Sequence, residues 1–177
     1  MGAGKWVVVV GGGDPYEVGL ATYNAVPDVS MLTGDVFDDE GNQPDSVTIT
    51  ISDFPDYYDI PFVIPTSQMV NLVLTWNLRF DDPFDPDSIA IAATQPLVDY
   101  INSLAVSEPM SIYQIGSVFL ASISKLVEPS QVSLIETNIW IDGVIAEPAP
   151  ESGLIYGNKY KYFTTDQSYV MVKQYGS

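Results

Sequence analysis

The chain has 177 residues, of which 46% are hydrophobic, and its 23 acidic and 6 basic side chains give a formal net charge of −17. It contains no cysteine and no histidine, which excludes disulfides, thiolate or imidazole metal ligands and catalytic triads built on these residues. The negative charge repels a phosphate backbone, so nucleic acid is not an expected partner. The length suits one domain or two very small ones.

The sequence predicts no membrane span, because no apolar run approaches the length of about 18 residues that crosses a bilayer. Residues 1–10 carry one lysine and no small-residue cleavage pattern, so we do not expect a secretory signal.

Residues 6–10 are a short apolar, β-branched run that ends at three glycines, a pattern typical of a buried strand entering a turn. A glycine-rich turn before a helix can bind phosphate through backbone amides. Here the turn lacks a following Gly-Lys-Ser/Thr and a G-x-G-x-x-G spacing, and Asp14 places a negative charge where the phosphate would lie. The favoured interpretation of Gly11 to Asp14 is a structural turn, with an anion or nucleotide site as the weaker alternative.

Helix start signals follow, namely an N-cap aspartate, a proline in the first turn and a glutamate at the capping-box position. We expect a helix over residues 15–25. Its buried face is predicted to consist of Tyr16, Leu20 and Tyr23.

Residues 33–45 form a polar, acidic loop with clustered carboxylates, which are the ligands that calcium and magnesium prefer. Neither residues 35–46 nor residues 81–92 match the spacing of an EF-hand loop. We therefore expect solvated loops and no metal site.

Two strands are predicted from a period of two between apolar positions. The first is half-buried, spans about residues 47–51 and is followed by a turn-rich link over 53–59 and a short extended piece over 60–65. The second is long and carries the clearest signal in the chain, with apolar side chains at six successive even positions: Val70, Leu72, Leu74, Trp76, Leu78 and Phe80.

Two helices are expected after a loop over residues 81–88. The first covers about residues 89–104, and Pro96 should kink or split it because proline removes one backbone donor. The second begins at Ser111 with Gln114 at the capping-box position. Its buried stripe is predicted to be Ile112, Ile115, Phe119, Ile123 and Leu126.

The remaining chain is predicted to be β-rich. Residues 132–145 resemble a hairpin with its tight turn at Asp142 and Gly143. Residues 148–153 form a linker-like break, and residues 160–175 are expected to form a final pair of short strands.

Together these elements predict an α+β fold, in which a mixed sheet is covered by about three helices in the order strand-helix-strand-strand-helix-helix-strand. A small C-terminal β appendage completes it. The expected domains are residues 1–147 and a β-rich appendage over residues 148–177.

No residue type in the chain is singled out for catalysis. Two carboxylates across a cleft can hydrolyse a glycosidic bond, but with 23 acids such a pair is expected by chance. Tyrosines can stack on sugars, although strand packing or a protein interface is the more usual role; the candidates are Tyr57, Tyr58, Tyr156, Tyr160, Tyr162, Tyr169 and Tyr175. We expect no catalytic, cofactor-binding or metal-binding residue, and no cofactor.

Four segments in chain order carry a family resemblance. They are residues 10–18 (Val-Gly-Gly-Gly-Asp-Pro-Tyr-Glu-Val), residues 60–65 (Ile-Pro-Phe-Val-Ile-Pro) leading into 70–76, residues 98–104 (Val-Asp-Tyr-Ile-Asn-Ser-Leu) and the close of the chain over 160–175. With these segments the chain resembles the baseplate J-like proteins of contractile-tailed bacteriophages, over nearly its whole length.

The resemblance implies a wedge protein of the tail baseplate, without catalytic residues, located in the virion after assembly in the host cytoplasm. Its implied partners are neighbouring wedge subunits and sheath or hub components, contacted through basic surfaces, with multiple copies around a symmetric baseplate. Family members usually have further domains before this region, so residues 1–147 would correspond to a wedge-type domain in the C-terminal portion. The alternative from another class is a tail protein that binds or cleaves cell-surface glycan.

Overall fold

The computed structural model describes residues 5–79 and 85–176. Within them it contains three α-helices and nine strands in mixed sheets, which confirms the predicted α+β class. Phe80 and the part of the expected loop over residues 81–84 lie outside the described residues.

The chain divides into two compact units, each with its own core. The hairpin unit comprises Met1–Thr66 and Asn158–Lys161, and the sheet unit comprises Ser67–Gly157 and Tyr162–Ser177. The expected boundary between residues 147 and 148 does not coincide with this division.

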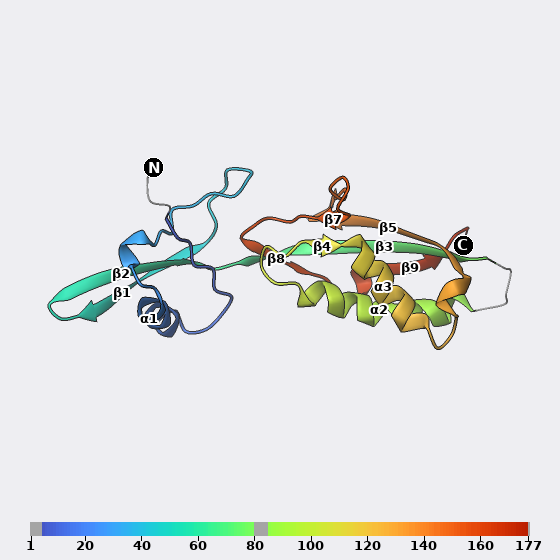
Figure 1. Ribbon diagram of the computed structural model, residues 1–177, viewed down its shortest axis with the longest axis horizontal. Coiled ribbons are helices and arrows are strands. Elements are labelled where there is room, and N and C mark those ends of the chain that lie inside the picture. Colours follow the sequence, from blue (N-terminus) through green and yellow to red (C-terminus); the bar gives the residue numbers. More distant parts are fainter. Residues whose placement is uncertain (1–4, 80–84, 177) are drawn as a thin grey trace. The chain divides into compact units, whose positions relative to one another are not determined.

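The hairpin unit is built on two antiparallel strands, β1 (Ser46–Asp53) and β2 (Asp56–Val63). Helix α1 (Pro15–Ala25) packs against the hairpin, as Figure 1 shows, and a short 3-10 helix, η1 (Val29–Met31), follows it in the chain. The bounds of α1 match the helix predicted over residues 15–25.

The core of this unit lies between α1 and one face of the hairpin. Ile51 and Ile60 are 3% and 0% exposed there, and Leu20 and Tyr23 pack around them. The turn-rich link expected over residues 53–59 is wrong, because β2 already begins at Asp56.

Two further expectations for this unit are wrong. Residues 6–10 are not a buried strand: Trp6 and Val9 each form only an isolated bridge, and Trp6 is 44% exposed. Tyr16 is 51% exposed, because the buried positions of α1 are Gly19 and Thr22. The helix meets β1 at a glycine, and the contact face is therefore rotated away from Tyr16.

The sheet unit is organised around β3 (Thr66–Leu78), which pairs antiparallel with β5 and parallel with β9. The sheet has the order β6-β5-β3-β8, with β9 as a further partner of β3. The other strands of this sheet are β5 (Val132–Ile141), β6 (Val144–Ile145), β8 (Lys161–Thr164) and β9 (Val170–Gln174).

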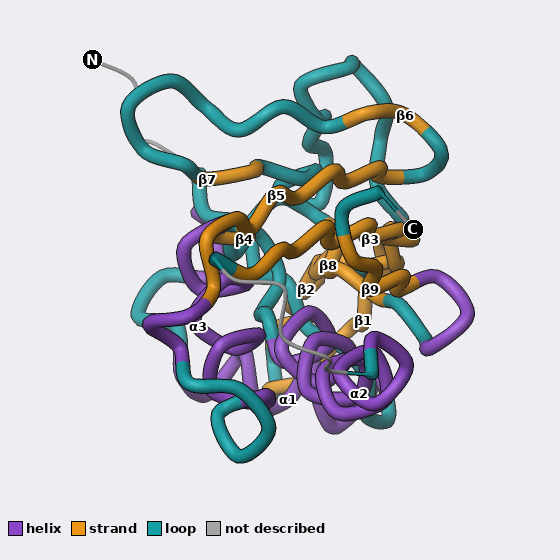
Figure 2. The backbone as a smooth tube through the Cα atoms, turned by 90° about the vertical axis from the view of Figure 1, so that its right-hand side faces the viewer, coloured by secondary structure: helices purple, strands orange, loops and turns teal. Residues whose placement is uncertain are grey.

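The alternation predicted for β3 is confirmed as its buried face. Val70, Leu72, Leu74 and Trp76 are 0% exposed, and Leu78 is 9% exposed. Helices α2 (Pro86–Ser103) and α3 (Ile112–Ile123) cover this face of the sheet, as Figures 1 and 2 show.

Helix α2 is continuous through Pro96, so of the two effects predicted for this proline, a kink or a split, the split does not occur. Proline removes one backbone donor, but Ala93, Leu97 and Ile101 on the turns around it are 0% exposed. Tertiary packing of this face supplies most of the stability of such a helix.

In α3, the predicted stripe is buried at Ile115, Phe119 and Ile123. Leu126 is 42% exposed, contrary to the prediction, because the helix ends at Ile123. Val127, at 1% exposure, occupies the buried position instead.

The C-terminal segment completes the sheet unit and does not form an appendage. Val170 and Val172 of β9 lie in the same core as the β3 face. The hairpin predicted at Asp142 and Gly143 is confirmed, with positive φ angles of 51° and 81° that close the turn between β5 and β6. Smaller elements of this unit are β4 (Met110–Ser111) paired with β7 (Leu154–Ile155), and the 3-10 helices η2 (Pro129–Gln131) and η3 (Gln167–Tyr169).

Trp76 gives a direct test of the β3 core. Its side chain is 0% exposed and its indole N–H has no hydrogen-bond partner among the described residues. Trp76→Ala should lower the free energy of unfolding by about 3–5 kcal/mol. Trp76→Phe should cost clearly less, because it keeps most of the ring and removes a buried donor that makes no hydrogen bond. Urea unfolding of both variants checks this; equal losses would contradict it.

Two helical glycines are expected to show opposite changes in stability when each is replaced by alanine. A Cβ at Gly19 of α1 would lie 2.9 Å from Cβ of Ile49, whereas a Cβ at Gly116 of α3 would meet nothing within 4 Å. Gly116→Ala should stabilise the protein by about 0.5–1 kcal/mol through helix propensity. Gly19→Ala should destabilise it, because the close helix–strand approach must open.

Thermal unfolding of the two variants measures these changes. Stabilisation by Gly19→Ala would show that the helix can move away from β1 without loss.

Candidate functional site

The carboxylate of Asp14, the last residue of the Gly11 to Asp14 turn, caps the helix that follows. Oδ1 of Asp14 accepts hydrogen bonds from the backbone N–H of Tyr16 at 3.0 Å and of Glu17 at 3.2 Å. Gly12 and Gly13 have φ angles of 93° and 99°, which explains the glycines by backbone conformation. Two amides at the start of the helix, which an anion site there would need, are already bonded to Asp14, so this geometry favours the structural interpretation.

The acidic segment of residues 38–42 is tied to residues 158–159 of the same unit. Asp38 accepts from the backbone N–H of Asn42 at 2.6 Å and from Nδ2 of Asn158 at 2.7 Å. Nζ of Lys159 lies 2.8 Å from Asp39, and this hydrogen bond raises the pKa of the lysine. Both ends of that ion pair are solvent-exposed, so it contributes little to the stability of the fold.

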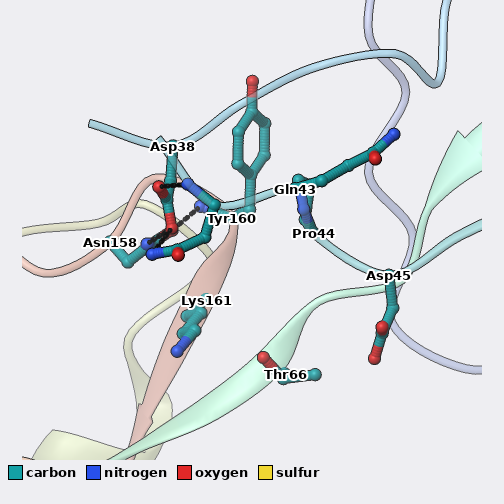
Figure 3. A pocket seen from close by; sticks show the side chains of 9 residues that line it. Asp38, Gln43, Pro44, Asp45, Thr66, Asn158, Tyr160 and Lys161 are labelled. Atoms are coloured by element: carbon teal, nitrogen blue, oxygen red, sulfur yellow. Dashed lines mark hydrogen bonds between the residues drawn. The ribbon is translucent and has the colours of Figure 1, made fainter. Parts of the chain in front are cut away.

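Figure 3 shows the pocket of about 190 Å³ that this segment borders. Its lining is Asp38, Asn42, Gln43, Pro44, Asp45, Thr66, Asn158, Tyr160 and Lys161. The dashed lines in Figure 3 show that the Asp38 carboxylate faces protein donors. Over residues 5–79 and 85–176, no three acidic side chains gather closely enough to hold a metal ion.

The pKa of Asp38 is lowered from its ordinary value. Partial desolvation acts to raise the pKa, but hydrogen bonds from the backbone of Asn42 and the side chains of Asn158 and Asn42 outweigh it. Asp38 is therefore a structural carboxylate that joins two distant segments of the sequence.

The tyrosines singled out in the sequence do not form one stacking platform. Tyr57 and Tyr58 lie in the hairpin unit, where Tyr57 is 74% exposed and Tyr58 packs on Tyr23 with ring centroids 5.3 Å apart. Tyr160 also belongs to the hairpin unit and borders the pocket of Figure 3. The sheet unit holds Tyr156, Tyr162, Tyr169 and Tyr175, which are 62%, 40%, 41% and 64% exposed.

The tip of the β1–β2 hairpin carries the most exposed large apolar side chain in the described residues. Phe54 is 94% exposed, and a phenylalanine left in water forgoes about 1.5–3 kcal/mol of burial free energy. Asp53 and Asp56 flank it as directly opposed partners in the ladder. Like charges in this arrangement destabilise a strand pair.

Tyr23 holds the base of this tip. Its hydroxyl donates to Oδ2 of Asp53 at 2.7 Å, and this hydrogen bond, with some desolvation, raises the pKa of Tyr23 to about 12. The phenol therefore remains a donor throughout the neutral range.

A second apolar surface lies in the sheet unit, between α3 and β5. It is an open hollow of about 430 Å³, lined by Ile112, Tyr113, Gly116, Ser117, Leu120, Ile135 and Thr137. None of these lining side chains is charged.

Sequence reasoning missed Phe54, because residues 53–59 were interpreted as a link and not as a hairpin. A signal was present: Asp53 and Pro55 are turn-forming residue types, and they place a phenylalanine between them at the turn.

The chain matches no protein-family model, and no curated protein matches it. The helices described by the structure include none with the length and apolar character needed to cross a membrane.

Asp38 allows a test by pH. A lowered pKa in the folded state means that the ionised form stabilises the protein above the unfolded pKa, and that this contribution disappears as pH falls through the folded pKa. Asp38→Asn should therefore destabilise the protein near neutral pH, with a difference from wild type that shrinks as pH falls below about 4.

Asp35→Asn is the control, because it removes a charge from the same loop but its carboxylate accepts no hydrogen bond in the described residues. Urea unfolding over a pH series compares the two variants. A loss for Asp38→Asn that is independent of pH would contradict the role given to its charge.

Proposed function

We propose that this chain is a structural component of a phage tail baseplate, a wedge protein that functions through protein–protein interfaces in baseplate assembly and tail contraction. It would be located in the virion, after assembly in the host cytoplasm, and present in multiple copies. The resemblance carried by residues 10–18, 60–76, 98–104 and 160–175 supports this proposal.

The observation that carries the proposal is apolar surface exposed on a highly charged molecule. Phe54 and Tyr57 are 94% and 74% exposed, and the chain has a net charge of −17. Exposed aromatic side chains are enriched where proteins contact each other. Their exposure in an isolated chain is accounted for if neighbouring subunits cover them.

The negative charge of the chain indicates what kind of surface the neighbouring subunits would present. No basic residue occurs between Lys5 and Arg79, so β1, β2 and the acidic loop present carboxylates without a compensating cation from that stretch. Surfaces of opposite sign steer association and select partners. Sheath, hub or neighbouring wedge proteins with basic surfaces would meet this requirement.

Purified virions of the phage that encodes the chain provide the test. Antibodies against the chain should label the baseplate end of the tail, and a reconstruction of the particle should contain its fold in several symmetric copies. Absence from the baseplate would overturn the proposal.

The glycan alternative is decided by a separate assay on the same protein. Binding on a glycan array, or peptidoglycan release that one carboxylate substitution abolishes, would favour a carbohydrate-active tail protein.

A further inference from the structure

The β1–β2 hairpin is an arm whose inner face is fixed by packing as far as its last residue pairs. Ile51 and Tyr58 are ladder partners, and Ile51 is 3% exposed against the α1 side. The hydrogen bond from Tyr23 to Asp53, at 2.7 Å, extends this support to the final pair. The turn that follows is therefore held in place by the fold.

Phe54 lies in this supported turn and its side chain is not packed against the rest of the chain. Its side chain is 94% exposed, and it belongs to neither hydrophobic core. Tyr57, on the exposed side of the first residues of β2, is 74% exposed. Single exposed apolar residues are ordinary, but here two aromatic side chains are three residues apart at a supported tip.

Acidic side chains lie on both sides of Phe54 and Tyr57 in the hairpin. Asp53 and Asp56 face each other across the end of the ladder, and Asp59 follows in β2. These carboxylates repel phosphate groups and anionic lipid headgroups, which argues against nucleic acid or a membrane surface as the partner of the tip.

A second copy of the chain is also a poor partner for this tip. The copy has 23 acids and 6 bases, and the apolar hollow beside α3 has no basic side chain in its lining. The complementary surface is instead an apolar pocket with lysine or arginine at its rim.

We propose that the hairpin tip, residues 53–57, docks on another protein by inserting Phe54 into an apolar pocket rimmed by basic side chains. This inference rests on the proposed function only for the identity of the partner, which would be a neighbouring baseplate protein.

Photocrosslinking tests this in the cells where the full-length chain is naturally made. The variant Phe54→benzoylphenylalanine carries the photoreactive group at the tip, and Ile91→benzoylphenylalanine is the matched control at a 79% exposed position of α2. The expected result is a covalent adduct from position 54 to a peptide of another protein with Lys or Arg beside apolar residues. Position 91 should not give this adduct.

Other outcomes overturn the inference. These are an adduct to a second copy of the chain, an adduct to lipid or nucleic acid, or labelling from position 54 no greater than from position 91. Detection of the wild-type chain in virions is scored separately. A tip-specific adduct to a protein outside the baseplate would therefore support the docking surface while counting against the baseplate assignment.

Affinity for the crosslinked protein, once purified, measures the contribution of each group. Phe54→Ser should weaken binding roughly 30-fold, the effect of removing an interface hot spot, and Ile91→Ser less than about twofold. Asp56→Lys should also weaken binding, with an effect that diminishes at high salt. Unfolding temperatures no lower than wild type are expected, because these side chains are exposed and Asp56→Lys removes the like-charge pair with Asp53. Unchanged affinity of Phe54→Ser would refute the docking role.

Discussion

Burial of one face of β3 is the constraint on which the sheet unit depends. Val70, Leu72, Leu74 and Trp76 are fully buried, and the same strand pairs with β5 on one side and with β8 and β9 as further partners. Because strand side chains alternate, a register shift of one residue would place these four side chains on the opposite face. The positions of α2, α3 and the C-terminal strands all follow from keeping this face covered.

The hairpin unit meets a different requirement, because its core is small. Three buried residues, Leu32, Ile51 and Ile60, are surrounded by partly buried neighbours. Gly19 compensates by allowing α1 to approach β1 closely, since even a single Cβ there would lie 2.9 Å from Ile49. Hydrogen bonds from Asn42 and Asn158 to Asp38 then tie the acidic loop to a segment more than a hundred residues later.

Local signals in the sequence were sufficient wherever one interaction dominated. The caps of α1 and α3, the alternation in β3 and the Asp142–Gly143 turn were all predicted, because each depends on neighbours in the chain. The failures had non-local causes: burial holds α2 together through Pro96, β9 joins β3 from the other end of the chain, and β2 begins earlier than its turn-like composition suggested. The tip at Phe54 was hidden by that last error, since it exists only once the hairpin is formed.

Two features of the tip do not add to the stability of the hairpin, namely the exposed ring of Phe54 and the opposed carboxylates. A glycine or asparagine turn would close the hairpin without exposing an aromatic ring, and an uncharged pair would avoid opposing Asp53 to Asp56. Both features cost stability in the isolated chain, and Tyr23 partly offsets the second by donating to Asp53. Residues that lower the stability of a fold are commonly retained for a function other than folding. Here that role is the proposed contact with a basic, apolar surface, where burial would return the free energy that the exposed ring forgoes.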